Sequence, residues 1–419
     1  MRAIVFVGLL ALAAAAEKVS FDNYRVYRVI PASAEHLNIL KKLESANDEY
    51  SYWKGPSQVF RPVDLMVSPG QQANFTALMD AADMRYTTYI ENVQSLIDRE
   101  ESENRASTGA FNWTRYHDLN EIYDWLHAVA EAYPDTVKVV DAGGSSEGRL
   151  IKGVKLNFGA SKKPGVFIEG GIHAREWISP ATVTYLVNAL LTSRQPEVRE
   201  LAEAYDWYIF PVFNPDGYVY TRTTNRFWRK TRVMRNFSSC HGVDANRNWG
   251  YKWMQGGASD NPCDETYAGP NAFSEIETEL MAEYISSIGH KLFAYIAFHS
   301  YSQLLLFPYG NTPEHLDNYE EEKTMGLAAI DALSKRYGTS YTTGNIPEIL
   351  YIATGCSMDW VKDTFRLPVT YTYELRDQGA SGFLLPAEQI IPNGEEVVDS
   401  LVALFKTAAT LGYPSKARP

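Results

Sequence analysis

The sequence lacks a surplus of positive charge and any long apolar run, and each absence excludes a class of protein. The formal net charge is −12, which argues against nucleic acid as the main partner, because phosphate binding needs clustered Lys and Arg. No apolar stretch reaches the about 20 residues that a membrane-spanning helix needs. The chain has no P-loop, no dinucleotide-binding glycine fingerprint, no His-Glu-x-x-His and no internal repeat. What remains is a soluble globular protein of 419 residues, long enough for more than one domain.

The N-terminus has the pattern of a secretory signal. A basic start is followed by an apolar run over 3–12 and by small residues before Glu17. This order predicts a signal peptide over residues 1–16 and export from the cell; a buried or disordered N-terminal helix is the alternative. Three possible glycosylation sites, at Asn74, Asn112 and Asn236, agree with secretion.

Export affects how the three cysteines are interpreted. Cys240 and Cys263 flank a loop-like segment and are candidates for a disulfide in an oxidising compartment. Cys356 is then left over and is expected to be a buried free thiol. The sequence alone allows three pairings.

Two structural units are predicted after the signal. The first alternates strands and helices over about eighty residues, within the range of an independent domain; its strands are expected over 24–30, 59–67 and 86–89, and its helices over 34–43 and 75–79. Its charge-dense tail, 92–105, predicts a solvated helix that runs into a polar link over 106–110. Because proteases cut such links, we expect a propeptide, 17–105, released by a trypsin-like enzyme after Arg105.

The second unit, 106–419, has the alternation of a larger α/β domain. Short strands are expected over 137–140, 153–156, 166–169, 207–212, 293–298 and 370–373, and helices over 119–131, 180–191 and 274–287. Alternating strands and helices favour a mixed, mostly parallel sheet covered on both faces. Gly144 to Gly148 formally matches the nucleophile elbow of serine hydrolases. A strand rather than a helix follows it, however, so a hairpin turn is the better interpretation.

Three candidate metal ligands follow two of these strands. His173 and Glu176 come directly after the strand over 166–169, and His299 follows the strand over 293–298. Active sites of open α/β sheets lie beyond the strand ends, so these side chains are expected to converge. Two imidazoles and a carboxylate are typical of catalytic Zn²⁺. Glu374 ends a third strand, where a carboxylate among apolar and aromatic residues needs a buried partner or a catalytic role. It is a candidate base; the alternative is a salt bridge to Arg376 or another Arg.

Two basic clusters stand out in this acidic chain, over 225–232 and 244–249. Such clusters are usually solvated faces. Arginines among aromatic and amide residues suit bidentate binding of a carboxylate.

With these residues the chain resembles the secreted zinc metallocarboxypeptidases of the digestive carboxypeptidase A/B family, in their zymogen form. The resemblance extends over about three hundred residues and is carried by His173-x-x-Glu176, His299, 228–230, 244–248, Tyr351 and 374–377. Residues 17–105 resemble the family's propeptide, and 383–386 its C-terminal region. The resemblance implies a carboxypeptidase-like twisted sheet preceded by a small α/β propeptide with an antiparallel sheet.

The family's site residues carry over position by position. The resemblance implies that His173, Glu176 and His299 bind one Zn²⁺ and that Asp244 orients His173. Glu374 is then the general base toward the zinc-activated water and later protonates the leaving amine, and Arg229 stabilises the developing oxyanion. The matching substrate-binding positions are Asn246, Arg247 and Tyr351 for the terminal carboxylate, and Arg175, Ser300 and Tyr301 further along the peptide.

The pocket for the last side chain matches Leu306, Gly310, Ile346, Ala353, Cys356, Met358 and Thr372. Met358 occupies the position where B-type enzymes have Asp. An apolar Met cannot compensate a buried Lys or Arg, so we expect an A-type preference for aliphatic or aromatic C-terminal residues. Cys356 stands where Gly is usual and Met358 is bulkier than the common apolar choice, which favours medium-sized side chains over Trp.

The expected partners are peptide C-termini and an activating protease, with a monomer in the digestive lumen. One alternative is a non-catalytic protein that binds peptide carboxylates on the same fold. Intact ligands and Glu374 count against it. An inhibitor or storage protein is a further alternative, which no residue supports.

Overall fold

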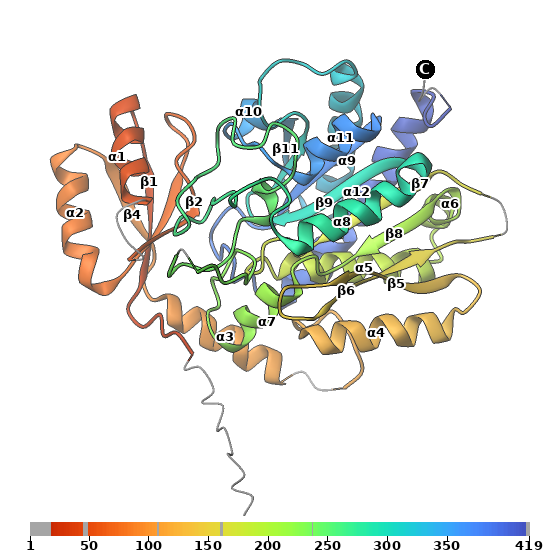
Figure 1. The fold of residues 1–419 in the computed structure, drawn as a ribbon, viewed down its shortest axis with the longest axis horizontal. Helices are drawn as coiled ribbons and strands as arrows, with labels where there is room; N and C mark the ends of the chain where they lie inside the picture. Colours follow the sequence, from red (N-terminus) through yellow and green to blue (C-terminus); the bar gives the residue numbers. More distant parts are fainter. Residues whose placement is uncertain (1–17, 45–48, 107–108, 160–161, 237, 416–419) are drawn as a thin grey trace, which may run out of the picture.

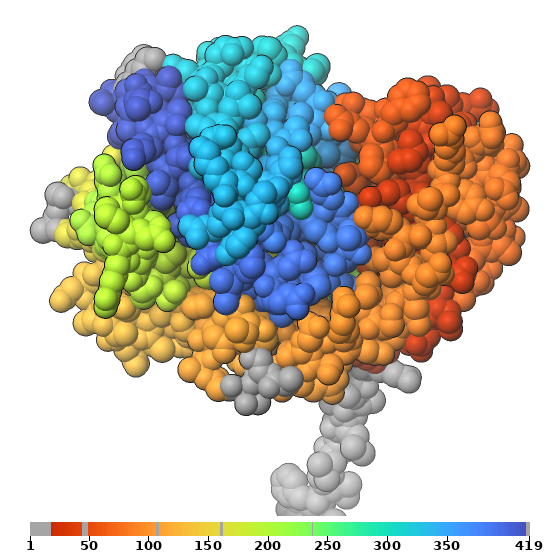
Figure 2. Space-filling view, turned by 180° about the vertical axis from the view of Figure 1, so that it is seen from behind, coloured from red at the N-terminus to blue at the C-terminus, as the bar shows by residue number. Residues whose placement is uncertain are grey.

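The computed structural model describes residues 18–44, 49–106, 109–159, 162–236 and 238–415. The expected signal peptide, 1–16, lies outside these residues. A small N-terminal unit, red and orange in Figure 1, stands beside a larger one that carries an eight-stranded sheet. Seen from behind in Figure 2, the two units are in contact along one side of the larger one. Within the described part of the chain, no helix has the length and apolar composition needed to cross a bilayer.

The small unit is built on an antiparallel sheet of order β2-β3-β1-β4. Its strands are β1 (Arg25–Ile30), β2 (Tyr50–Lys54), β3 (Val63–Val67) and β4 (Arg85–Ile90). Helices α1 (Ala34–Glu44) and α2 (Gln72–Ala81) bury side chains such as Leu40 and Phe75 against one face. The opposite face, with Val26, Trp53 and Met66, packs against the large unit.

The structure of the small unit differs from the sequence prediction in one missed strand and two wrong expectations. β2 was not predicted, because its sequence lacks a clean apolar alternation. The strand expected from residue 59 begins at Val63, since Phe60 turns the chain with a φ of 66° and is 70% exposed. The helix α3 (Val93–Ala106) is not solvated all round: Val93 and Ile97 are buried, and Glu100 is 5% exposed.

The large unit contains a mixed sheet of order β11-β10-β12-β9-β7-β8-β6-β5. Its members are β5 (Val137–Gly144), β6 (Leu150–Leu156), β7 (Gly165–Gly170), β8 (Asp206–Phe210), β9 (Leu292–Ser300), β10 (Leu304–Phe307), β11 (Thr342–Asn345) and β12 (Val369–Leu375). The central strands β12, β9, β7 and β8 are parallel, whereas β6 and β10 join them antiparallel. The predicted mixed sheet is therefore confirmed, although β10 and β11 were missed, because a strand of four residues is too short to show a hydrophobic period.

Helices cover both faces of this sheet. One face packs against α4 (Leu119–Ala132), α5 (Ile178–Thr192), α6 (Pro196–Ala204), α7 (Pro215–Thr223), α9 (Tyr319–Tyr337) and α12 (Ile390–Thr410). The other packs against α8 (Ile276–Ile288), α10 (Ile346–Ile349) and α11 (Ser357–Phe365). Alternate residues of β7 explain the two layers, because Ile168 faces the first set and Phe167 the second.

Two local predictions are also confirmed. Residues 144–148 form the turn of the β5–β6 hairpin, and Ser146, the serine of the pattern, donates its hydroxyl to Asp216 Oδ2 at 3.0 Å, so it is not a nucleophile elbow. Cys240 and Cys263 form a disulfide, with Cα atoms 5.1 Å apart, and Cys356 is a buried free thiol.

Candidate metal centre and substrate cleft

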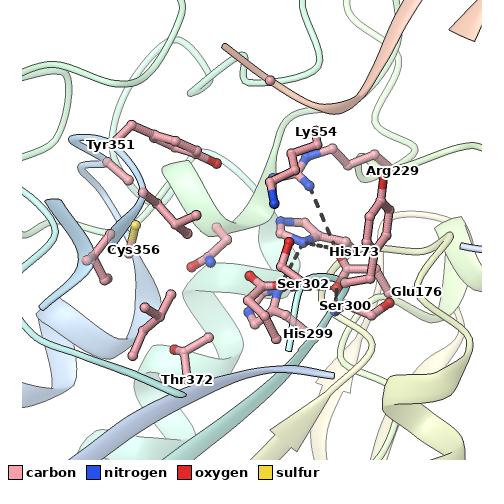
Figure 3. A pocket seen from close by; sticks show the side chains of 18 of the residues that line it. Lys54, His173, Glu176, Arg229, His299, Ser300, Ser302, Tyr351, Cys356 and Thr372 are labelled. Carbon is pink, nitrogen blue, oxygen red and sulfur yellow. Dashed lines mark hydrogen bonds and ion pairs between the residues drawn. The ribbon is translucent and has the colours of Figure 1, made fainter. Parts of the chain in front are cut away.

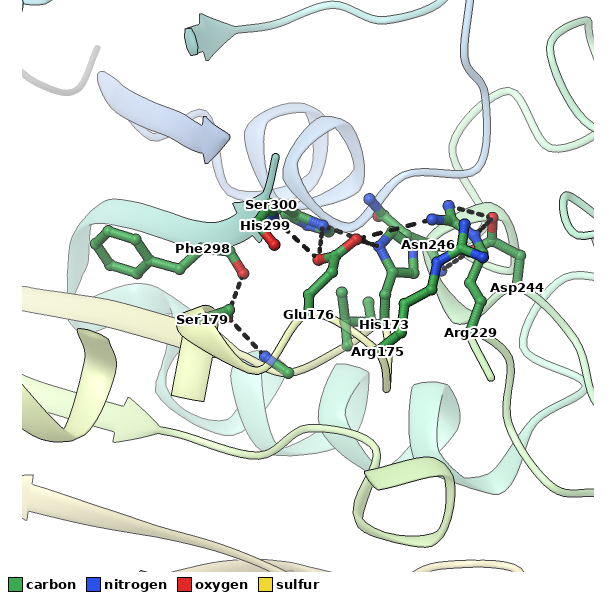
Figure 4. A network of polar contacts seen from close by, with 12 residues as sticks. His173, Arg175, Glu176, Ser179, Arg229, Asp244, Asn246, Phe298, His299 and Ser300 are labelled. Carbon is green, nitrogen blue, oxygen red and sulfur yellow. Dashed lines mark hydrogen bonds and ion pairs between the residues drawn. The ribbon is translucent and has the colours of Figure 1, made fainter. Parts of the chain in front are cut away.

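A glycine turn after β7 brings the first two candidate ligands to the edge of the sheet. Gly171 adopts a φ of 67°, which an L side chain rarely tolerates. The chain then passes His173 and Glu176 before α5 begins. The Ser179 side chain holds this turn, because its Oγ accepts a hydrogen bond from Gly171 N and donates one to the carbonyl of Phe298 on β9 (Figure 4). His299 follows Phe298 and therefore lies beside the turn.

Ligand atoms of these three residues converge within 4.8 Å of one another. Nδ1 of His173 lies 2.8 Å from Oε1 of Glu176 and 3.1 Å from Nδ1 of His299. His299 Nδ1 lies 3.2 Å from Oε2 of Glu176. All three side chains are almost fully buried.

This donor set fits a bound cation. Nε2 of His173 lies 3.1 Å from Oδ1 of Asp244, so the proton of the neutral imidazole belongs on Nε2. Its Nδ1 then presents a lone pair to the Glu176 carboxylate and to another imidazole nitrogen. Lone pairs at such short separations repel unless a positive charge lies between them. Two imidazole nitrogens and one carboxylate also match the ligands of catalytic zinc.

Buried arginines balance the carboxylates around this centre. Arg229 Nη2 donates to Asp244 Oδ2 at 2.7 Å, and its Nη1 lies 3.8 Å from Glu176. Burial alone would raise the pKa of Asp244, but Arg229 and His173 hold it well below its usual range. The pKa of Glu176 is likewise lowered, because His173 and His299 outweigh its burial. Both carboxylates therefore stay ionised.

Glu374 stands next to the metal ligands on the neighbouring strand. β12 pairs with β9 so that Glu374 lies opposite His299. Burial raises the pKa of Glu374 to about 7, while His299 and Arg229 act in the opposite direction. A carboxyl with this pKa takes up and releases a proton near neutral pH. No Arg salt bridge holds Glu374 among the described residues, so the alternative of a structural pair is wrong.

A second group of polar side chains lies in the same cleft, 17 and 18 residues after Arg229 and in the loop between α10 and α11. Asn246 and Arg247 line the cleft together with Tyr351, whose ring is 38% exposed (Figure 3). Arg247 Nε donates to Gly257 O at 2.9 Å, and the guanidinium lies 4.0 Å from Asp244. Asn246 Oδ1 accepts from Ser357 N at 2.9 Å. A guanidinium, an amide and a phenol thus line the same cleft as Glu374.

The expected pocket residues are brought together with two exceptions. The cleft is lined by Leu306, Ile346, Ala353, Cys356, Met358 and Thr372, and also by Ser300 and Tyr301. Gly310 is not among the lining residues, and it packs so closely on Ala353 that a Cβ atom there would stand 2.6 Å from the Ala353 carbonyl. Arg175 points elsewhere: it donates to Glu265 at 2.9 Å and to the carbonyl of Tyr52 at 3.3 Å.

Residues of the small unit close the outer side of the cleft, which sequence reasoning did not foresee. Trp53, Lys54 and Gly55 line it beside the metal ligands, and Figure 3 shows Lys54 near Arg229. Trp53 packs on Phe227 and Phe383, with ring centroids 4.9 and 5.6 Å apart. Only the docking of two separate units brings Lys54 to this place, so no local signal could have shown it.

Further hydrogen bonds hold the small unit on the large one. Asp64 Oδ2 accepts from the Tyr301 hydroxyl at 3.0 Å and from Arg28, whose Nη2 also donates to the carbonyl of Gln378. Glu100 binds Arg226 through two hydrogen bonds of 2.7 and 2.9 Å, at 5% and 2% exposure. The small unit is therefore a cap over the cleft.

Comparison with known proteins agrees with this geometry. Residues 122–400 match the family model described as zinc carboxypeptidase, and residues 27–100 match that of the carboxypeptidase activation peptide. A zinc carboxypeptidase A 1 of Anopheles gambiae is 46% identical over 403 residues, covering 95% of this chain and 93% of that protein. A carboxypeptidase B of Astacus astacus is 45% identical over 291 residues, covering 69% and 96%. The crystal structure of the carboxypeptidase A from Helicoverpa armigera has a TM-score of 0.85 at 27% identity, covering 94% and 100%.

Proposed function

The chain belongs to the zinc carboxypeptidase family, and we propose that its released enzyme is of the A type, removing aliphatic or aromatic residues from peptide C-termini. The observation that carries this proposal is the pocket floor. Met358 is 2% exposed, and its Sδ accepts a hydrogen bond from the Thr372 hydroxyl at 3.4 Å. The hydroxyl is thereby satisfied within the wall, and the pocket offers a substrate an apolar surface.

A basic C-terminal side chain has no partner in such a pocket. Asp359, the residue after Met358, is fully buried and accepts a hydrogen bond from Gly310 N behind the wall. It does not line the cleft. An ammonium or guanidinium group in this pocket would lose its water without gaining a counter-charge, which is very unfavourable. The bulk of Cys356 and Met358 supports a preference for Leu, Ile or Phe over Trp.

We assign the metal site to His173, Glu176 and His299, with Asp244 as the acceptor that fixes the tautomer and the ring orientation of His173. When bound there, zinc polarises the scissile carbonyl and makes the attacking water more acidic. Glu374, which lies opposite His299 on the neighbouring strand, would take a proton from that water and pass it to the nitrogen of the leaving residue.

The clamp for the terminal carboxylate consists of Asn246, Arg247 and Tyr351. Arg247 is 3% exposed and supplies a guanidinium, whose paired N–H groups suit a carboxylate. The clamp explains why the enzyme is an exopeptidase, because a residue inside a chain has no carboxylate to offer. Arg229, which lies between the clamp and the metal ligands, stabilises the charge that develops on the carbonyl oxygen.

The cap accounts for latency before activation. Arg105, near the end of α3, is exposed, so a trypsin-like protease can reach it and release the propeptide 17–105. Arg175 and Tyr301, which now bind the cap, then become free for the substrate further along the peptide. The signal-like N-terminus and the disulfide support secretion, and we place the enzyme in a digestive lumen as a monomer.

Blocked dipeptides ending in Phe, Leu, Arg, Lys or Glu test the proposal. They are assayed with the full chain before and after trypsin. We expect hydrolysis of the Phe and Leu substrates only after trypsin, with a new N-terminus at Ala106. Preference for Arg or Lys would contradict the pocket argument and leave the metal site untouched. Failure to hydrolyse any of them, with zinc bound, would favour the non-catalytic alternative.

A further inference from the structure

A buried carboxylate behind the cleft has no part in the chemistry described so far. Glu169, the fifth residue of β7, has no exposed surface. Its Oε1 accepts a hydrogen bond from the Ser357 hydroxyl at 3.0 Å. No well-placed donor reaches Oε2 among the described residues, and the Tyr295 hydroxyl is the other polar group beside this carboxyl. Burying a carboxylate with so few hydrogen-bond donors is unfavourable, so a compensating role is expected.

Ser357 connects this carboxylate to the clamp. It is the first residue of α11, so its backbone N–H has no partner within the helix. That N–H donates to Oδ1 of Asn246 at 2.9 Å. The backbone N–H of Asn246 donates in turn to Oδ1 of Asp244, the acceptor for His173 (Figure 4). A continuous series of hydrogen bonds therefore runs from Glu169 to the metal site.

These bonds decide which end of the Asn246 amide faces the cleft. A side-chain amide has an acceptor end and a donor end. Because Oδ1 is engaged by Ser357, Nδ2 is directed away from α11, and Asn246 lines the cleft. A donor is what a substrate carboxylate requires, whereas a rotated amide would present a repelling oxygen. Ser357 also lies between Cys356 and Met358, which both line the cleft.

We propose that Glu169 is a positioning residue for substrate binding. By holding Ser357 it fixes the first turn of α11, the orientation of the Asn246 amide and the spacing between clamp and pocket floor. Glu169 itself does not line the cleft. The inference rests on the proposed role of Asn246 in holding the terminal carboxylate.

Two variants test it in the trypsin-treated full chain. Glu169→Leu removes the acceptor, and Ser357→Ala removes the donor but keeps the backbone N–H. For each we expect the KM of a blocked dipeptide ending in Phe, and the Kd of 3-phenylpropionate measured by calorimetry, to rise about 5- to 30-fold, the effect of one lost buried hydrogen bond. We expect kcat to change less than about 3-fold and the zinc content to stay the same. Glu169→Gln keeps an acceptor oxygen, so its KM and Kd should stay within about 3-fold of the wild-type values.

Glu277 offers a matched control. It is also fully buried, Oε1 accepts a hydrogen bond from Ser146 N at 2.9 Å, and Oε2 lacks a well-placed donor among the described residues. It does not line the cleft, so Glu277→Leu should lower the melting temperature without changing KM or Kd.

The proposal is refuted if Glu169→Leu and Ser357→Ala behave like this control. It is also refuted if activity and zinc content fall together, since Glu169 would then act through the metal site. Should Glu169→Leu fail to fold, Ser357→Ala decides alone. A wild-type protein that is inactive after trypsin would instead overturn the proposed function.

Discussion

Ionisation of Asp359, behind the substrate pocket, is expected to destabilise the protein at neutral pH. The residue has no exposed surface, and Gly310 N donates to its Oδ2 at 2.8 Å. Its Oδ1 has no partner in the described part of the chain. Burial raises the pKa of Asp359 to about 7; the Gly310 hydrogen bond and Arg247 oppose this shift, and Asp363 adds to it.

The size of the effect follows from linkage. An unfolded Asp has a pKa near 3.8, so a folded value of about 7 means that the unfolded chain releases its proton first. The stability tied to protonated Asp359 is complete below pH 3.8, falls as the pH rises and is lost above pH 7. About three pKa units correspond to about 4 kcal/mol, of which about 2–3 kcal/mol lies between pH 5 and pH 8.5.

Asp359→Asn removes the contribution of Asp359 ionisation to the free energy of unfolding. Its amide oxygen can still accept a hydrogen bond from Gly310 N, but the side chain cannot ionise. Unfolding of the full chain in denaturant is measured at pH 5 and pH 8.5, with recovery on refolding checked. The free energy of unfolding of the variant minus that of wild type should be about 2–3 kcal/mol larger at pH 8.5 than at pH 5. A difference between variant and wild type that is the same at both pH values would refute the reasoning.

Four further outcomes are expected. Glu374→Gln should lower kcat by about 10²–10⁴-fold while zinc and 3-phenylpropionate still bind, as shown by metal analysis and calorimetry; unchanged turnover would exclude Glu374 as the base. Met358→Asp should shift kcat/KM from C-terminal Phe toward Arg, since it supplies the missing counter-charge; no gain for Arg would contradict the pocket argument. Glu100→Gln leaves Arg226 buried without a full counter-charge, which should weaken docking of the cap by about 3–5 kcal/mol. Activity before trypsin should therefore rise, and unchanged latency would argue against this pair. Removal of zinc by a chelator should abolish hydrolysis and added Zn²⁺ should restore it, whereas activity without metal would disprove the metal mechanism.

The metal site could be anticipated because its signals are local. A strand that ends in a glycine turn carries His173 and Glu176 to a sheet edge wherever the rest of the chain lies, and His299 and Glu374 each end an apolar strand. Parallel pairing of β9 with β7 and β12 then places these residues side by side. The clamp residues could be recognised only through resemblance, since an Arg among amides also occurs on solvated surfaces.

Some parts of the site depend on contacts between distant segments, which a linear pattern does not contain. Lys54 reaches the cleft because the cap docks there, and Glu100 is buried by Arg226, 126 residues away. Gly310 packs against Ala353 and is not among the residues that line the cleft. The link from Glu169 through Ser357 to Asn246 joins three separate segments.

The sequence by itself thus identified the candidate metal ligands and the carboxylate of Glu374, because these depend on residue type and on strand ends. The proposed role of Glu374 as general base and the position of Met358 at the pocket floor came from the resemblance to the family. Only the tertiary structure decided which groups cap the cleft, which way the Asn246 amide points and which buried carboxylates carry an unsatisfied oxygen. These properties arise from packing between elements far apart in the chain, and packing is set by three-dimensional contact rather than by residue order.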